Sequence, residues 1–230
     1  MADKSTTDRQ AACHLVLTAD LVASRKVADR EALQATLLKT IKALNRGFRP
    51  SVEVPLSVSA GDEFQGVFLP DGQIVRLVDT LQRELHPVRA RVGIGIGGIS
   101  TGFRRRSQEM DGEAFLLARQ ALDATRRQSP DAWLWFRTPD EEFDLAANAI
   151  ALLLGLAKSR WKALHWRRAA LRDKGWSEQR IARREGVTHV AVSLSLRSAG
   201  YAAVRQAQSR LADVIARRWR YKPQGLNSRI

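Results

Sequence analysis

Hydrophobic and polar positions alternate along the first 137 residues in a way that predicts strands separated by helices. Residues 14–25 begin as an apolar, β-rich run, and residues 29–48 place leucine and isoleucine at helical spacing. Residues 51–69 form two apolar runs around a tight Gly-Asp turn, which is typical of a hairpin. The remaining segments are a helix at 73–85, a strand at 88–101, a helix at 112–127 and a strand at 131–137. This order, β-α-β-β-α-β-α-β, predicts a ferredoxin-like sheet with helices on one face and an extra strand.

The pattern becomes entirely helical after residue 137. An apolar stretch at 145–157 predicts one buried helix that runs from the junction at 138–145 to Gly175, because glycine commonly ends helices. The stretch is shorter than the roughly 20 residues that cross a bilayer. No membrane association is therefore expected.

Residues 176–201 have the spacing of a helix-turn-helix. Ala182 allows the two helices to cross closely, and Gly186 lies four residues later at the turn. Ser177 and Thr188 are placed to cap the two helices. A three-helix packing module without a nucleic-acid partner is the alternative.

The charge of the chain is concentrated in its last third. The net charge is +14, yet residues 1–145 contain 20 basic and 20 acidic side chains, whereas residues 146–230 contain 18 basic and 4 acidic ones. This asymmetry indicates two domains and a polyanionic partner, a nucleic acid, for the second, and a solvated basic face without a partner is the alternative. Together with the helix-turn-helix spacing it favours double-stranded DNA. We expect a sheet domain at 1–139, a basic helix-turn-helix domain at 140–222 and a disordered tail at 223–230.

Two further features concern location and assembly. Cys13 is the only cysteine, which excludes an internal disulfide and fits a reducing, cytoplasmic location. An apolar stripe at 204–215 either completes the core of the helical domain or pairs two subunits. Pairing would suit DNA binding, because two half-sites lie about one helical turn apart, and we expect a homodimer.

Glycines alternate along one side of the strand at 88–101. Gly93, Gly95 and Gly98 satisfy the dinucleotide pattern G-x-G-x-x-G, but they lie inside the strand and no helix opens on them, so we reject that interpretation. The glycines leave the sheet face opposite the helices partly bare. That face is either a platform for a ligand or a surface covered by the second domain or a partner subunit.

Acidic residues end the first predicted strand and form the turn of the hairpin. Asp20 follows the strand, and Asp62 and Glu63 lie at the turn. In a ferredoxin-like sheet the first strand neighbours the hairpin, so Asp20 and Asp62 are expected to face each other. Two close carboxylates repel unless a cation or a proton lies between them, and Mg²⁺ prefers such oxygen ligands. Paired turn acids without a metal are the alternative.

Together these segments resemble the palm of class III nucleotidyl cyclases and of GGDEF diguanylate cyclases. Four motifs are more closely similar to those of the SatD family, whose members carry this palm-like half followed by a helix-turn-helix: ADLVASR (19–25), GDEFQG (61–66), RVGIGIGGIST (91–101) and GEAFLLAR (112–119). The resemblance covers nearly the whole chain. It implies an α+β fold in which a cyclase-like palm precedes an all-α helix-turn-helix domain.

The resemblance also implies a metal and nucleotide site. In the cyclases, the acid at the strand end and the acid after the hairpin glycine bind the metals of a nucleoside triphosphate. These acids match Asp20 and Asp62, with Glu63 beside them, so the resemblance implies Mg²⁺ or Mn²⁺ there and the same three residues as the catalytic set of an enzyme. The residues expected to contact the nucleotide are Ser24, Arg25, Gly61, Gly93, Gly95 and Arg119.

The second domain is expected to read DNA with the helix that follows Thr188. Early residues of such a helix face base edges in the major groove, while basic side chains around it hold phosphates. Arg167, Arg168 and Lys174 are candidates for further phosphate contacts. The main expected contacts are Arg180, Arg183, Arg184, Thr188, His189, Ala191, Ser193 and Arg197.

Two functions remain open. In the first, the chain is a DNA-binding regulator whose cyclase-like domain senses a nucleotide together with a divalent metal. In the second, it is a nucleotidyl cyclase or nucleotidyltransferase that converts a nucleoside triphosphate with Mg²⁺. Leu116 stands where class III cyclases carry an asparagine, and Arg119 lies one residue off their usual spacing. The set of residues for the transition state is therefore incomplete, which favours the first function.

Overall fold

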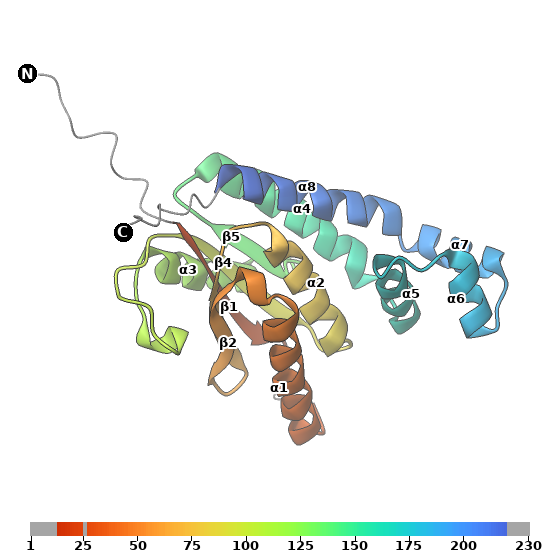
Figure 1. Cartoon of the computed structure of the whole chain (residues 1–230), viewed down its shortest axis with the longest axis horizontal. Coiled ribbons are helices and arrows are strands. Elements are labelled where there is room, and N and C mark those ends of the chain that lie inside the picture. The colour runs from red at the N-terminus through yellow and green to blue at the C-terminus, as the bar shows by residue number, and fades with distance from the viewer. Residues whose placement is uncertain (1–12, 25–26, 220–230) are drawn as a thin grey trace, which may run out of the picture.

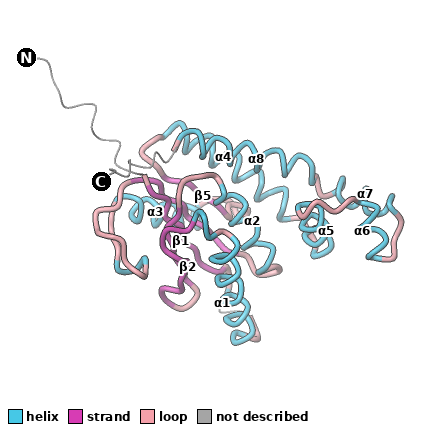
Figure 2. Tube along the Cα trace, viewed as in Figure 1, coloured by secondary structure: helices cyan, strands magenta, loops and turns pink. Residues whose placement is uncertain are grey.

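The computed structural model describes residues 13–24 and 27–219, so Arg25 and the tail predicted at 223–230 lie outside the described residues. It contains a five-stranded sheet with helices on both faces and a helical end beyond the sheet (Figures 1 and 2). The strands are β1 (His14–Leu21), β2 (Val52–Ala60), β3 (Glu63–Phe68), β4 (Ala90–Gly97) and β5 (Leu134–Arg137). The helices are α1 (Arg30–Gly47), α2 (Gln73–Leu85), α3 (Glu113–Arg127), α4 (Glu141–Ser159), α5 (Ala163–Asp173), α6 (Glu178–Glu185), α7 (His189–Ser198) and α8 (Tyr201–Arg218). Within the described ranges, no helix has both the length and the hydropathy that crossing a bilayer requires.

The sheet has the order β2-β3-β1-β4-β5. Strand β1 lies at its centre, antiparallel to both β3 and β4, while β5 is parallel to β4. A central strand is covered on both faces, which explains why β1 is an almost uninterrupted buried run. The predicted α+β class and the predicted order of strands and helices are confirmed.

Helices cover both faces of the sheet, which differs from the one-sided arrangement predicted above. Leu15, Leu17 and Ala19 of β1 join the larger core, which also contains side chains of α1, α2, α4 and α8. Val16 points to the opposite face and joins a smaller core with Ala114 and other residues of α3. The sequence pattern of α3 is amphipathic like that of the other helices, so it could not show which face the helix would cover.

Helix α4 covers the outer edge of β5. The backbone N–H of Phe136 donates to Oδ1 of Asn148 (2.7 Å), and Nδ2 of Asn148 donates to the carbonyl oxygen of Phe136 (3.1 Å). The N–H of Thr138 donates to Oδ2 of Asp144 (3.1 Å). Buried backbone groups on an edge strand need such partners. This requirement accounts for the buried amide of Asn148 and the buried carboxylate of Asp144 on the inner side of α4.

The main core crosses the boundary predicted between residues 139 and 140. Phe143 and Ala147 of α4 and Leu211 and Ile215 of α8 belong to the same hydrophobic core as the sheet. The apolar stripe at 204–215 therefore does not complete a separate core of the helical domain, which was the first of its two predicted roles. Leu211 and Ile215 join the core of the sheet instead, and Val214 is exposed. A separate small core lies under α5 to α7, at the end of the molecule away from the sheet (Figure 1).

The single long helix predicted up to Gly175 is two helices, α4 and α5, with a turn between them. The turn lets Trp161 and Trp166 pack edge to face, with ring centroids 4.9 Å apart, and the indole N–H of Trp161 donates to the carbonyl oxygen of Ala199 (2.8 Å). Lys158, just before the turn, forms a buried ion pair with Asp79 of α2. Burial lowers the pKa of Lys158 below its ordinary value, although Asp79 opposes this shift. The ion pair of Lys158 joins α4 to α2, and the contacts of Trp161 join the turn to α5 and to Ala199 after α7.

Candidate functional site

Asp20 lies at the end of β1 on the sheet face that α3 covers, and arginines occupy both of its oxygens. Arg91, its partner in the register of β4, donates from Nε to Oδ1 (2.8 Å) and from Nη2 to Oδ2 (3.3 Å). Arg126 of α3 donates from Nη2 to Oδ2 (2.6 Å). Asp20 itself is buried. A buried carboxylate requires such compensation, and here two guanidinium groups supply it.

Glu63, the first residue of β3, forms a bidentate salt bridge with Arg119 of α3. The guanidinium donates from Nη1 to Oε2 (2.8 Å) and from Nη2 to Oε1 (2.5 Å). The hydrogen bond to Glu63 raises the pKa of Arg119 above its ordinary value, and the hydrogen bond to Asp20 does the same for Arg126. Partial burial opposes both shifts. We call Asp20, Glu63, Arg91, Arg119 and Arg126 the acid–arginine cluster.

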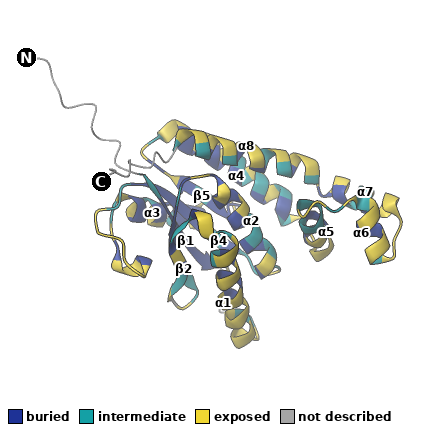
Figure 3. Ribbon diagram, viewed as in Figure 1, coloured by how far each residue is buried: buried dark blue, intermediate teal, exposed yellow. Residues whose placement is uncertain are grey.

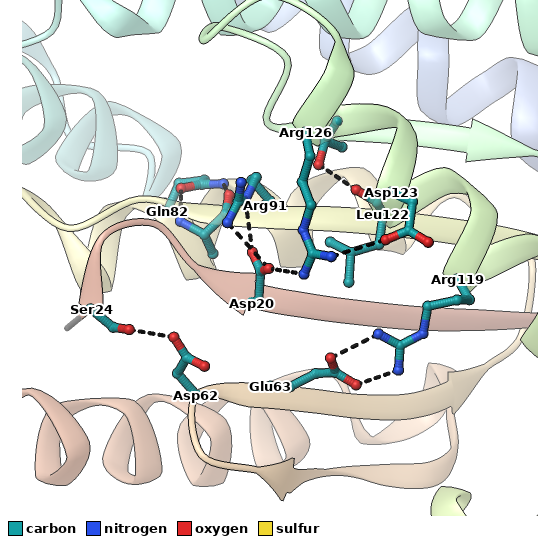
Figure 4. Close-up of polar contacts among 12 residues, drawn as sticks. Asp20, Ser24, Asp62, Glu63, Gln82, Arg91, Arg119, Leu122, Asp123 and Arg126 are labelled. Carbon is teal, nitrogen blue, oxygen red and sulfur yellow. Dashed lines mark hydrogen bonds and ion pairs between the residues drawn. The ribbon is translucent and has the colours of Figure 1, made fainter.

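Asp62 does not join this cluster. It lies in the hairpin turn between β2 and β3 and accepts a hydrogen bond from the hydroxyl of Ser24. Figure 4 shows Asp20 directed to its two arginines, Glu63 to Arg119, and Asp62 to Ser24. The expectation that Asp20 and Asp62 face each other across one cation therefore differs from the structure: each acid has its own partner.

The arrangement does not fit a divalent metal. Carboxylates are suitable ligands for Mg²⁺, but both oxygens of Asp20 and both of Glu63 already accept from guanidinium groups. A cation would have to displace these arginines and share their positive environment. Among the residues that the structure describes, no group of three or more His, Cys, Asp or Glu side chains is placed to hold a metal ion.

Gly93 and Gly95 lie against α3, so the sheet face that the sequence left bare is covered by the chain's own helix. A Cβ atom on Gly93 would lie 2.2 Å from the backbone nitrogen of Leu122, and one on Gly95 would lie 2.2 Å from the carbonyl oxygen of Ala114. The glycines permit close packing of helix on strand. The predicted contact of these two residues with a nucleotide is therefore wrong for this arrangement. Gly61 has a different role, because its φ of 59° places it in the left-handed region at the hairpin turn.

Two residues of the acid–arginine cluster, Arg91 and Arg126, were not among the predicted site residues, although the sequence contains a signal for each. Arg91 precedes the glycines on the same strand, at the position that β1 places beside Asp20. Arg126 lies seven residues, or about two helical turns, after Arg119, so both point from the same side of α3. Neither position could be connected with Asp20 before the pairing of β1 with β4 and the placement of α3 were known.

The predicted helix-turn-helix is present as α6, a turn and α7. The hydroxyl of Ser177 accepts from the N–H of Arg180 (3.1 Å), and that of Thr188 accepts from the N–H of Ala191 (3.2 Å), so both predicted caps are confirmed. Gly186 ends α6 with a left-handed φ of 66°. The core of the module consists of Ile181, Ala182, Val192 and Leu196, with Leu171, Trp176 and Tyr201 packed against it.

Most of the residues predicted to contact DNA are exposed on this module. The exposed residues are Arg180, Arg183, Arg184, Thr188, His189, Ala191 and Arg197, and Ser193 is half-buried. Arg180 lies over the ring of Trp176, with its guanidinium carbon 3.8 Å from the ring centroid. Val190, which was not among the predicted contacts, is also exposed. Its position, two residues before the buried Val192, places it on the opposite side of the helix.

Arg168 has a structural role, contrary to the phosphate contact considered above. Its side chain is buried, and it pairs with Glu185 (2.7 Å) and donates to the carbonyl oxygen of Ala191 (3.2 Å). It therefore connects α5, α6 and α7. Arg167 also pairs with Glu185 (3.0 Å), but its side chain is 61% exposed compared with 6% for Arg168. Lys174 is exposed, as a phosphate contact requires.

Comparison with known proteins places the chain in a family. The model of the SatD family matches residues 14–214, which is most of the chain, and the chain therefore belongs to the SatD family. Two solved structures of a bacterial light-regulated adenylyl cyclase are similar in fold. One is 16% identical, with a TM-score of 0.41, and the match covers 54% of this chain and 43% of that one. The other is 19% identical, with a TM-score of 0.40, and covers 54% and 75%, respectively. No curated protein matches the chain significantly.

Proposed function

We propose that this member of the SatD family is a DNA-binding regulator that contacts double-stranded DNA with α6 and α7. The observation that carries the proposal is a group of exposed arginines around an exposed second helix on a folded helix-turn-helix module. Arg180, Arg183 and Arg184 of α6 and Arg197 of α7 point to solvent. A surface of this charge, next to a helix that fits the major groove, has the properties that binding to the phosphate backbone requires.

The geometry of the module suits the start of α7 to contacts with bases and the arginines of α6 to contacts with phosphates. Thr188 caps α7, and His189 and Ala191 lie in its first turn, where such helices meet base edges. The arginines of α6 lie outside this turn and are suited to phosphates, which fix the register without reading sequence. Trp176 restricts the side chain of Arg180 by stacking, which reduces the conformational entropy lost on binding.

Replacing Arg183 with alanine is expected to lower the salt dependence of DNA affinity. One phosphate contact releases about one counterion, so the slope of log K against log salt concentration should fall by about one unit. Fluorescence anisotropy with a labelled duplex at several salt concentrations measures this slope. Arg46→Ala, a change of an exposed arginine on α1, is the matched control and should leave the slope unaltered. Equal slopes for both variants would show that Arg183 does not contact a phosphate. A wild-type chain that does not bind duplex DNA would refute the proposal.

The second part of the proposal assigns nucleotide sensing to the acid–arginine cluster. Three guanidinium groups converge there from β4 and α3, and guanidinium is well suited to phosphate. The phosphates of a nucleotide would compete with Asp20 and Glu63 for these arginines. This exchange would loosen α3 from the sheet, because the same ion pairs join the two. Turnover is not part of the proposal, because Asp20 and Glu63, expected to be catalytic in an enzyme, are held by arginines.

Nucleoside triphosphates are expected to raise the melting temperature of the wild-type chain but not that of Arg119→Ala. The reason is that the alanine variant lacks one of the three phosphate-binding groups. Each shift is measured by differential scanning fluorimetry relative to the same variant without nucleotide, with and without Mg²⁺ or Mn²⁺. Arg127→Ala, an exposed neighbour on α3, is the control and should behave as wild type. A shift that survives in Arg119→Ala would place the nucleotide elsewhere, and a new product from labelled triphosphate would favour the enzyme instead.

A further inference from the structure

The outward side of α4 is apolar although nothing in the described chain covers it. Leu145, Leu153 and Leu156 are 75%, 65% and 42% exposed, respectively. The inner side of the same helix is already used, because it packs into the main core and covers β5. A helix on the surface of a monomer normally has one apolar side. Figure 3 shows exposed segments along α4, and exposed apolar residues that gather on one surface mark an interaction site.

The exposed side has the spacing of a helix-pairing seam. Leu145, Ala149, Leu152 and Leu156 follow one another at intervals of four, three and four residues. This is the interval pattern of the core positions in coiled coils, where each side chain fits between residues of the facing helix. Beside the seam, a hollow of about 330 Å³ is lined by residues of α4 and by Trp135 of β5. Such a hollow offers space for a leucine of a second helix.

The seam is complementary to itself when two copies run antiparallel. Its midpoint lies between Ile150 and Ala151, so Leu145 of one copy lies level with Leu156 of the other, and Ala149 lies level with Leu152. The charges at the ends follow the same symmetry. The exposed Glu141 and Glu142 begin the helix, and the exposed Arg160 follows its last residue. An antiparallel pair brings the acidic end of each helix to the basic end of the other, whereas a parallel pair brings like charges together.

We propose that α4 is the interface with a second copy of this chain, in which the two α4 helices pack antiparallel about a twofold axis. In such an interface each residue meets the same set of residues on the partner, so a self-complementary seam is what twofold symmetry requires. The proposal concerns a different surface from the α8 stripe, whose Leu211 and Ile215 are buried in the main core. It does not depend on DNA binding or on nucleotide binding.

The first test places carboxylates in the seam. Leu145→Glu combined with Leu156→Glu should weaken dimerisation by more than about a hundredfold, because four leucines per dimer are lost and the new carboxylates lie opposite one another. Sedimentation equilibrium of the nucleic-acid-free full chain measures the mass over a range of concentrations. The wild type should approach twice the 25.7 kDa of one chain, and the variant should stay at one. Leu38→Glu changes an exposed leucine of α1 and should leave the dimer intact. A monomeric wild type, or a dimer that survives the double change, overturns the proposal.

The second test decides the orientation. Glu142→Arg alone and Arg160→Glu alone should each weaken the dimer by about tenfold, since each places like charges together at both ends of the seam. The two changes in one chain should restore the affinity, because the opposite charges meet again in an antiparallel pair. Thermal unfolding under monomeric conditions shows whether each variant folds. Failure of the double change to restore affinity, in a chain that folds normally, would overturn the antiparallel arrangement.

Discussion

Replacing Gly95 with alanine is expected to lower the free energy of unfolding by about 3 kcal/mol or more. The new Cβ would lie 2.2 Å from the carbonyl oxygen of Ala114 and 2.3 Å from the backbone nitrogen of Ala118. Both contacts are with the backbone of α3, so no side-chain rotation relieves them and the whole helix has to shift. Overpacking of this kind typically costs about 1–3 kcal/mol, and a shift of α3 also disturbs the ion pairs of Arg119 and Arg126. Denaturant unfolding measures the effect.

Gly98→Ala is the matched control for this prediction. A Cβ on Gly98 would have no atom within 4 Å, so the change should alter the free energy of unfolding by less than about 0.5 kcal/mol. If Gly95→Ala is as stable as the wild type, α3 does not lie on β4 as described. The acid–arginine cluster would then lose its geometric basis, because two of its three arginines come from α3.

Replacing Arg168 with methionine is expected to destabilise the helix-turn-helix module by about 3 kcal/mol. Methionine retains most of the apolar stem, but Glu185 loses its buried partner and the carbonyl oxygen of Ala191 loses a donor. Removing one partner of a buried ion pair typically costs about 3–5 kcal/mol. Arg167 still reaches Glu185, which places the expectation at the lower end of this range. Hydrogen exchange should show reduced protection in α6 and α7, and DNA affinity should fall because the module opens.

Arg167→Met separates this buried role from the loss of positive charge. Arg167 pairs with the same carboxylate, but its side chain is mostly exposed, so its removal should cost no more than about 1 kcal/mol. Adding Glu185→Leu to Arg168→Met should recover part of the lost stability, because the unpaired charge is then gone. Equal destabilisation by the two single changes would contradict the structural role of Arg168 described here.

Local chemistry made much of the second half predictable. A serine or threonine hydroxyl caps a helix by accepting a hydrogen bond from a backbone N–H two or three residues later. Glycine adopts the left-handed conformation without steric conflict. Ser177, Gly186 and Thr188 could therefore be assigned their positions from sequence alone, and the structure confirms all three. The turn between α4 and α5 could not be predicted in this way, because it depends on the hydrogen bond from Trp161 to Ala199, which lies far along the chain.

The sequence by itself determined the class of fold, the order of strands and helices up to residue 137 and the basic character of the last third. These properties follow from periodicity, turn residues and composition, which act over a few residues or as sums over many. The tertiary structure alone decided that α3 covers the glycines of β4, that Asp20 meets Arg91 and Arg126, and that the outward side of α4 is left without a cover. The physical reason is that an amphipathic helix has a buried side whichever face of the sheet it covers. Likewise, a carboxylate can bind either a metal ion or a guanidinium group. Only the packing of elements distant in sequence selects between them.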